Sequence, residues 1–132
     1  MLKYFLFIFS CKNAKIDHIM NSVATKNVKI VVFVPGTHAA AVREAMGKAG
    51  AGKIGNYTYC TFSSKGVGRF RPEQGANPHI GEVGKFEEVE EERIETVCTK
   101  ESLGVVIKAM KEVHPYDEVA FDVYPLENIN EI

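Results

Sequence analysis

The sequence GAGKIGNYTYCTFSSKGVGRFRPEQGANPHIGEVG, from Gly50 to Gly84, decides how this chain folds. It contains eight of the eleven glycines in 132 residues. Because glycine has no Cβ and adopts positive φ at little cost, this spacing indicates tight turns. Two short strands are predicted between the turns, at Tyr57–Ser63 and Val67–Arg71. The flanking segments alternate strand and helix patterns, so this stretch interrupts an ordinary βα scaffold.

The scaffold begins with Val28–Val34 (VKIVVFV), which has the strongest strand pattern in the chain. β-Branched residues dominate it and both of its faces are apolar, which predicts a central strand covered on both sides. Pro35 ends the strand, and Thr37 is the expected N-cap of the next helix. That helix is predicted from His38 to about Ala49, where the glycines begin.

The second half of the scaffold follows the glycine-rich stretch. The acidic run Lys85–Glu92 is compatible with the end of a long strand or with a loop, and the alternating Arg93–Cys98 predicts a strand. Thr99 is expected to cap a second helix, Lys100–Val113, whose apolar residues recur at helical spacing. Glu118–Tyr124 alternates apolar and polar residues and predicts the last strand.

The element order predicts an α+β fold, the ferredoxin-like βαββαβ sandwich with an elaborated β-hairpin region. Two right-handed crossovers place both helices on one face of the sheet. On the first strand Val31 and Phe33 point to the opposite face, and Phe62 and Phe70 are candidates to join them. Covering that face needs another layer, so we expect a homo-oligomer, with a trimer favoured over a dimer.

The scaffold is expected to occupy residues 28–126, followed by a tail at 127–132. Residues 1–27 precede it and contain the apolar run Leu2–Phe9, which is too short to span a bilayer of about 20 helical residues. This segment is compatible with a weak secretory signal, with an added strand or arm on the domain, or with sequence upstream of a start at Met20. We favour the added strand or arm.

Composition narrows the function. A net charge of −1, without a basic run interleaved with aromatic residues, argues against a nucleic-acid partner. Cys11, Cys60 and Cys98 lie far apart and form neither a CxxC pair nor a disulfide pattern, which favours a reducing cytoplasm. No membrane span is predicted, and the sequence requires no cofactor.

Few patterns point to chemistry. The glycine-rich stretch could hold a phosphate on backbone N–H groups, but it matches neither the P-loop nor the dinucleotide motif, and hairpin turns explain it better. Candidate metal ligands are His79, His114 and Glu118, which lie in the NPHIG and HPYDE segments. They form no HExxH motif or His pair within one helical turn. No catalytic Ser-His-Asp arrangement is legible.

Three blocks occur in order along the chain: KIVVFVP with HAAAVREAM, the glycine-rich stretch with KFEEVEEERIETV, and HPYDEVAFDVYPL. Together they resemble the insert domain of the NIF-three-like family, over about Val28–Leu126. The resemblance implies a ferredoxin-like fold similar to CutA and PII signalling domains, which usually form trimers. Asp117 stands where the family more often has Glu, and this change keeps the charge.

The resemblance also limits the function that we expect. Full-length members of the family carry two metal ions on His and acidic residues in flanking core halves, and no residue of this chain matches those ligand motifs. A metal-dependent hydrolase is therefore the least favoured hypothesis, and the label of a type-two GTP cyclohydrolase homologue is not transferred as an activity.

Our sequence-based hypothesis is a non-enzymatic, cytoplasmic, homo-oligomeric module with a regulatory or ligand-binding role. By analogy with PII it would bind a small anion, nucleotide or metal between subunits. The alternative is a module for protein–protein interaction or assembly. The expected ligand-binding residues lie in two glycine-rich loops: Gly55, Asn56, Tyr57, Gly75, Asn77, His79 and Gly81.

Overall fold

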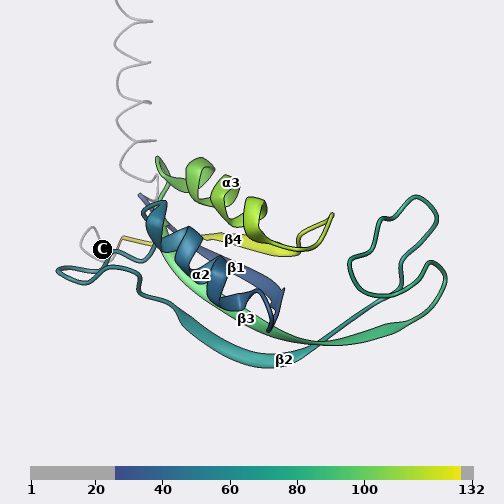
Figure 1. Ribbon diagram of the computed structural model, residues 1–132. Coiled ribbons are helices and arrows are strands. Elements are labelled where there is room, and N and C mark those ends of the chain that lie inside the picture. Colours follow the sequence, from purple (N-terminus) through teal and green to yellow (C-terminus); the bar gives the residue numbers. More distant parts are fainter. Residues whose placement is uncertain (1–25, 129–132) are drawn as a thin grey trace, which may run out of the picture.

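The computed structural model describes residues 26–128, which form an antiparallel sheet with helices on one face (Figure 1). Along the chain the elements are β1 (Asn27–Pro35), α2 (Ala39–Lys48), β2 (Phe62–Phe70), β3 (Glu87–Thr99), α3 (Leu103–Val113) and β4 (Phe121–Pro125). The strands lie side by side in the order β2-β3-β1-β4. The predicted ferredoxin-like βαββαβ sandwich is therefore confirmed.

Two sequence-based expectations concern the N-terminal segment and the absence of a membrane-spanning helix. The N-terminal arm or strand expected at residues 1–27 falls, apart from its last two residues, outside the described residues. Within residues 26–128, no helix is both long enough and apolar enough to cross a bilayer.

The core lies between β1 and the two helices. Alternate residues of a strand share a face, and one face of β1 presents Ile30, Val32 and Val34 to the helices. These side chains are fully buried, as are the residues that the helices turn toward them, which are Val42, Met46, Val106 and Met110. The spacing of those helix residues is the amphipathic pattern that the sequence shows.

The side chains on the opposite face of β1 are partly buried within the single chain. Val31 is fully buried in the single chain, and Phe33 is half-buried. Phe33 is paired with Arg93 of β3, whose guanidinium carbon lies 5.7 Å from the centre of the phenyl ring. The Arg93 side chain thus covers some of the apolar surface that the sequence pattern assigns to a partner subunit. Phe62, which was expected on the same face, is 67% exposed.

The glycine-rich stretch differs from its prediction. Instead of two strands it contains the single strand β2, and residues 57–61 lie outside any named strand. Tyr59 has φ of 59°, a left-handed conformation that interrupts a strand. A Cβ at Gly47 of α2 would lie 2.1 Å from the Tyr59 ring, so the missing side chain of Gly47 makes room for this ring.

The acidic run before residue 93 belongs to the 13-residue strand β3, which settles the choice between strand and loop. As a whole, β3 lies between β2 and β1. The pairing with β1 stops at Glu91, so residues 87–90 pair with β2 alone. This end of the β2–β3 hairpin extends beyond the rest of the sheet (Figure 1).

The helix starts also differ from prediction. Helix α2 has His38, not Thr37, at its N-cap, and the Thr37 hydroxyl instead lies 2.8 Å from Nδ1 of His38. Helix α3 begins at Leu103, and Thr99 caps the preceding turn, where its hydroxyl accepts the Ser102 N–H at 3.2 Å. The last strand, β4, begins at Phe121 rather than at Glu118.

Candidate functional site

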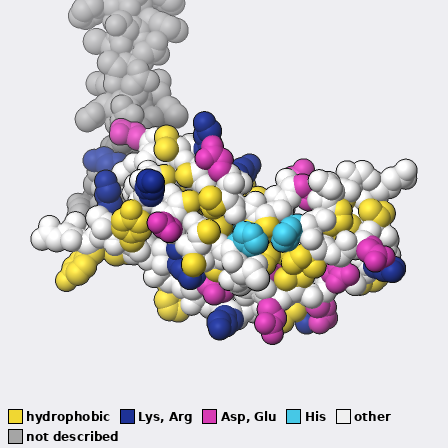
Figure 2. Space-filling model, viewed as in Figure 1, with side chains coloured by type: hydrophobic (Ala, Val, Ile, Leu, Met, Phe, Trp, Pro, Cys, Tyr) yellow, Lys and Arg dark blue, Asp and Glu magenta, His cyan; other side chains and the backbone are white. Residues whose placement is uncertain are grey.

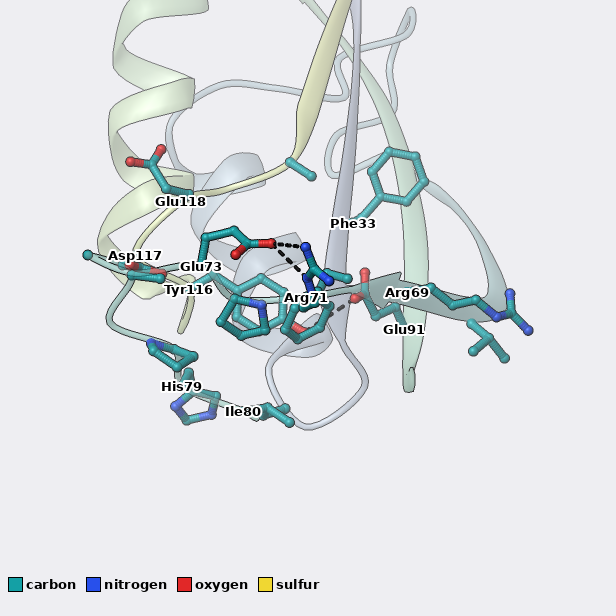
Figure 3. Close-up of a pocket in the computed structure, with 18 residues that line it drawn as sticks. Phe33, Arg69, Arg71, Glu73, His79, Ile80, Glu91, Tyr116, Asp117 and Glu118 are labelled. Atoms are coloured by element: carbon teal, nitrogen blue, oxygen red, sulfur yellow. Dashed lines mark hydrogen bonds and ion pairs between the residues drawn. The ribbon is translucent and has the colours of Figure 1, made fainter. Parts of the chain in front are cut away.

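A cavity of about 700 Å³ lies between the outer half of the β2–β3 hairpin and two loops, residues 71–80 and 114–120 (Figure 3). Sites for small molecules commonly have this size. Most of its wall is apolar. The aromatic and aliphatic residues that contribute are Phe33, Val67, Phe70, Pro72, Ala76, Pro78, Ile80, Tyr116 and Ala120.

A carboxylate, Glu91 of β3, lies in this mostly apolar wall. The Tyr116 hydroxyl donates a hydrogen bond to its Oε1 at 3.3 Å. Gly68 of β2 makes room for it, because a Cβ at that position would lie 2.1 Å from the same oxygen. A larger residue at position 68 would force the carboxylate to move.

Burial sets the protonation of this pair. It raises the pKa of the Glu91 carboxyl above its ordinary value, and the hydrogen bond from Tyr116 offsets part of the rise. Burial, followed by the negative charge of Glu91, also raises the pKa of the Tyr116 phenol. Tyr116 therefore keeps its proton and acts as the donor of the pair.

His114, at the end of α3, fixes the loop that carries Tyr116. Its Nε2 lies 2.8 Å from the carbonyl oxygen of Phe33 and must donate to it, because a carbonyl only accepts. Its Nδ1 accepts the backbone N–H of Tyr116 at 3.2 Å. His114 is only 7% exposed, so both ring nitrogens are used inside the domain.

The segment 71–80 forms the roof of the cavity. The backbone N–H of Asn77 donates to Oδ2 of Asp117 at 2.9 Å and holds the roof to the loop after α3. The ring of His79 lies edge-on to His38, with 5.6 Å between the ring centroids, and Figure 2 shows histidine side chains gathered at one place on this face. These contacts join the roof to α2 and to the end of α3.

The second glycine-rich loop of the predicted site is part of this cavity, but not every residue contributes in the same way. Gly75 and His79 line the cavity. Asn77 contributes its backbone N–H to the roof contact. Gly81 has φ of 95°, a conformation that favours glycine in this turn. A Cβ at this position would also lie 2.5 Å from the Glu87 side chain.

The first glycine-rich loop lies elsewhere. Gly55, Asn56 and Tyr57 form a turn closed by a bridge between Ile54 and Tyr57. Gly52, just before it, donates to the carbonyl of Val97 near the far end of β3. The two loops therefore lie at opposite ends of the β2–β3 region, and one chain does not bring them into a single site (Figure 1).

The candidate metal ligands do not converge. Within residues 26–128, no three His, Cys, Asp or Glu side chains are grouped so as to hold a metal ion. His114 has both nitrogens in hydrogen bonds. Glu118 lines the cavity but lies apart from His79 in Figure 3. The structure thus gives a structural role to His114, and it offers no metal centre at these residues.

Sequence reasoning missed the residues at the centre of this site, which are Phe33, Gly68, Glu91 and Tyr116. One signal was available: two glycines, Gly66 and Gly68, lie two positions apart in a strand, which leaves space on one face of the sheet. The register of β2 against β3 determines which acidic residue fills that space, and the sequence does not show this register.

The comparisons with known proteins agree with this fold. No protein-family model matches the chain. Over 103 residues it is 58% identical to the "GTP cyclohydrolase 1 type 2 homolog" of Halalkalibacterium halodurans, a match covering 78% of this chain and 28% of the relative. The chain therefore spans about a quarter of the length of such curated relatives.

Solved structures show two levels of likeness. A Bacillus cereus protein related to NIF3 matches with a TM-score of 0.69 and 55% identity, over 80% of this chain and 27% of that protein. The periplasmic divalent cation tolerance protein CutA from Archaeoglobus fulgidus matches with a TM-score of 0.58 at 17% identity, over 77% of this chain and 85% of CutA. The second likeness shows the fold alone.

The chain has the ferredoxin-like α+β fold, which it shares with CutA. More particularly, the chain is homologous to a segment of the NIF3-related proteins, and the resemblance to the NIF-three-like insert domain is confirmed.

The protonation of His114 gives a test of its structural role. Burial lowers the pKa of this imidazole below its ordinary value of 6.5, the Phe33 hydrogen bond opposes the shift, and the nearby His38 lowers it further. The unfolded chain therefore binds the proton more readily than the folded chain. The free energy of unfolding should be greatest above pH 6.5 and should fall as the pH drops below it.

Urea unfolding between pH 7.5 and 5 of the wild type and of His114→Asn measures this contribution. We expect the wild type to lose more stability over this interval than the variant, because the variant has no imidazole to protonate. Glu91 contributes a slope of opposite sign, but both proteins share it. Equal pH slopes for the wild type and His114→Asn would show that His114 does not titrate as described.

Proposed function

We propose that this chain is a non-enzymatic, homo-oligomeric regulatory module that binds a small molecule in the cavity beneath residues 71–80. The observation that carries the proposal is the cavity itself: about 700 Å³, with a mostly apolar wall that includes the hydrogen-bonded pair of Glu91 and Tyr116. A few polar groups in an apolar pocket orient a ligand and give specificity. The small anion, nucleotide or metal expected from sequence are the starting ligand classes.

Several features support a binding role over catalysis. Glu91 and Tyr116 share a hydrogen bond, and burial favours the uncharged form of each. A phenol that keeps its proton is a poor general base. The relatives' name refers to proteins of which this chain spans about a quarter, so their activity is not part of this proposal.

Two features support an oligomer. Among residues 26–128, strands β2 and β4 form the edges of the sheet, and each presents a row of backbone N–H and C=O groups that could pair with another chain. Phe62 on β2 is exposed, as is Tyr57 in the loop before it. A trimer is the expected state, followed by a dimer. The free thiols of Cys60 and Cys98 are in keeping with a cytoplasmic location.

Native mass spectrometry of gently purified protein, without added metal or chelator, tests the proposal. The expected result is an oligomer, with a trimer first, that carries additional mass of a few hundred daltons per chain. A monomer would contradict the oligomeric part of the proposal. A ligand-free oligomer that retains another protein in fixed ratio would favour the alternative, an assembly module built on exposed residues such as Phe62 and Tyr57.

A further inference from the structure

We infer that the cavity selects a small organic cation, an amine or amidine on an apolar body, and that Glu91 pairs with its charged nitrogen. This inference rests on the proposed function, because it names the ligand class of the same cavity. It departs from the anion or nucleotide that the glycine-rich loop suggests.

The charge of the lining is the first argument. Two arginines and four carboxylates line the cavity, so its net charge is −2 with His79 neutral; they are Arg69, Arg71, Glu73, Glu91, Asp117 and Glu118. Such a cavity attracts a cation and repels an anion, and its low-polarity wall strengthens both effects.

The arginines are already paired, which is the second argument. Arg71 bonds to Glu73 with 2.6 Å between Nη2 and Oε1, and its guanidinium carbon lies 5.2 Å from the centre of the Phe86 ring. Arg69 bonds to Glu88 at 2.9 Å, and Figure 3 shows it reaching away from the other labelled side chains. These ion pairs reduce the positive charge that the two arginines offer to a ligand phosphate or carboxylate.

Glu91 is the third argument. A carboxylate has about four acceptor positions, and among the described residues Tyr116 is the donor that bonds to this one. Asp117 also accepts one hydrogen bond, from the backbone N–H of Asn77, and this bond holds the roof in place. Burial disfavours the charged form of Glu91, and a cation within hydrogen-bond distance reverses that penalty.

The wall around Glu91 suits the rest of such a ligand. Phe33 comes from β1, Phe70 from β2 and Ile80 from the roof, and together they offer apolar and aromatic surface in the cavity that Glu91 also lines. Aromatic faces also attract organic cations. An aromatic amine therefore fits the cavity in both charge and polarity.

Tryptamine and indole-3-acetate are suitable probes, because they share an indole body and carry opposite charges. Calorimetric titration of the full chain at pH 7 should show tryptamine binding at least tenfold more tightly. Glu91→Gln should weaken tryptamine binding by at least tenfold, because it removes a charge-assisted hydrogen bond to the amine. Glu90→Gln is the matched control: it removes the same charge from the next residue of β3, which does not line the cavity.

A second pair of variants tests the geometry without changing any charge. Gly68→Ala places a Cβ where Glu91 Oε1 now lies, so tryptamine binding should weaken. Gly66→Ala lies two residues away on the same strand and meets nothing within 4 Å, so tryptamine binding should match that of the wild type. Each variant is checked for native unfolding cooperativity before titration.

The outcomes separate the inference from the proposed function. Equal or tighter binding of indole-3-acetate, or tryptamine binding unchanged in Glu91→Gln, overturns the inference. If neither probe binds but uncharged or anionic fragments shift the amide NMR signals of residues 71–80, the inference fails and the proposed function stands. If no fragment of a mixed library shifts those signals, both fail.

Discussion

Replacing Gly52 by Ala should lower the free energy of unfolding by roughly 2–4 kcal/mol. This figure adds the cost of a left-handed conformation at a non-glycine residue to the cost of a clash with the backbone. Gly52 has φ of 79°, and a Cβ there would lie 2.5 Å from the Cys60 nitrogen and 2.6 Å from the Cys60 oxygen. Backbone atoms cannot rotate aside as a side chain can. Relief of the clash therefore requires the backbones of Gly52 and Cys60 to move apart.

Two hydrogen bonds would be strained by that separation. Gly52 donates to the Val97 carbonyl at 2.7 Å and accepts the Cys60 N–H at 2.9 Å, so it joins the end of β3 to the approach to β2. Gly55→Ala is the control, since Gly55 has φ of 56° but its Cβ would meet nothing within 4 Å. It should cost only about 1 kcal/mol. Equal losses of the two variants in urea unfolding would contradict the argument from the clash.

Replacing Val106 by Ala should cost roughly 2 kcal/mol, because it removes two buried methyl groups and leaves a small cavity. Val106 is fully buried between α3 and the sheet, whereas the adjacent Val105 is 62% exposed. Val105→Ala removes the same atoms from the same helix and makes the same change in helix propensity. The difference between the two variants therefore measures burial alone.

The urea midpoints of the two valine variants provide the readout. Val105→Ala should stay within about 0.5 kcal/mol of the wild type, as exposed substitutions usually do. A loss in Val105→Ala as large as that in Val106→Ala would contradict the argument from burial.

The scaffold could be predicted from sequence because local patterns decide it. The β-branched run of β1 and the helical spacing of Val106 and Met110 each specify one element and one buried face. The glycine-rich stretch could not be divided correctly, since the left-handed Tyr59 depends on space at Gly47 in a distant helix. Tertiary contact overrides the local strand preference there.

The site was less predictable than the fold for a related reason. Phe33, Glu91 and Tyr116 come from three segments, and only strand register and the His114 hydrogen bonds bring them together. Glu91 also stands in an acidic run whose members look equivalent in sequence. Neighbouring elements give these glutamates different partners. Glu92 binds Arg43 of α2, and Glu88 binds Arg69 of β2.

The absent side chain of Gly68 ties two distant positions of the sequence together. In this structure the Glu91 carboxylate occupies the space that a Cβ of residue 68 would need. We expect chains that share this fold to combine a larger residue at position 68 with a shorter or displaced side chain at position 91. Paired variation of this kind would record in sequence how the carboxylate is placed over the cavity.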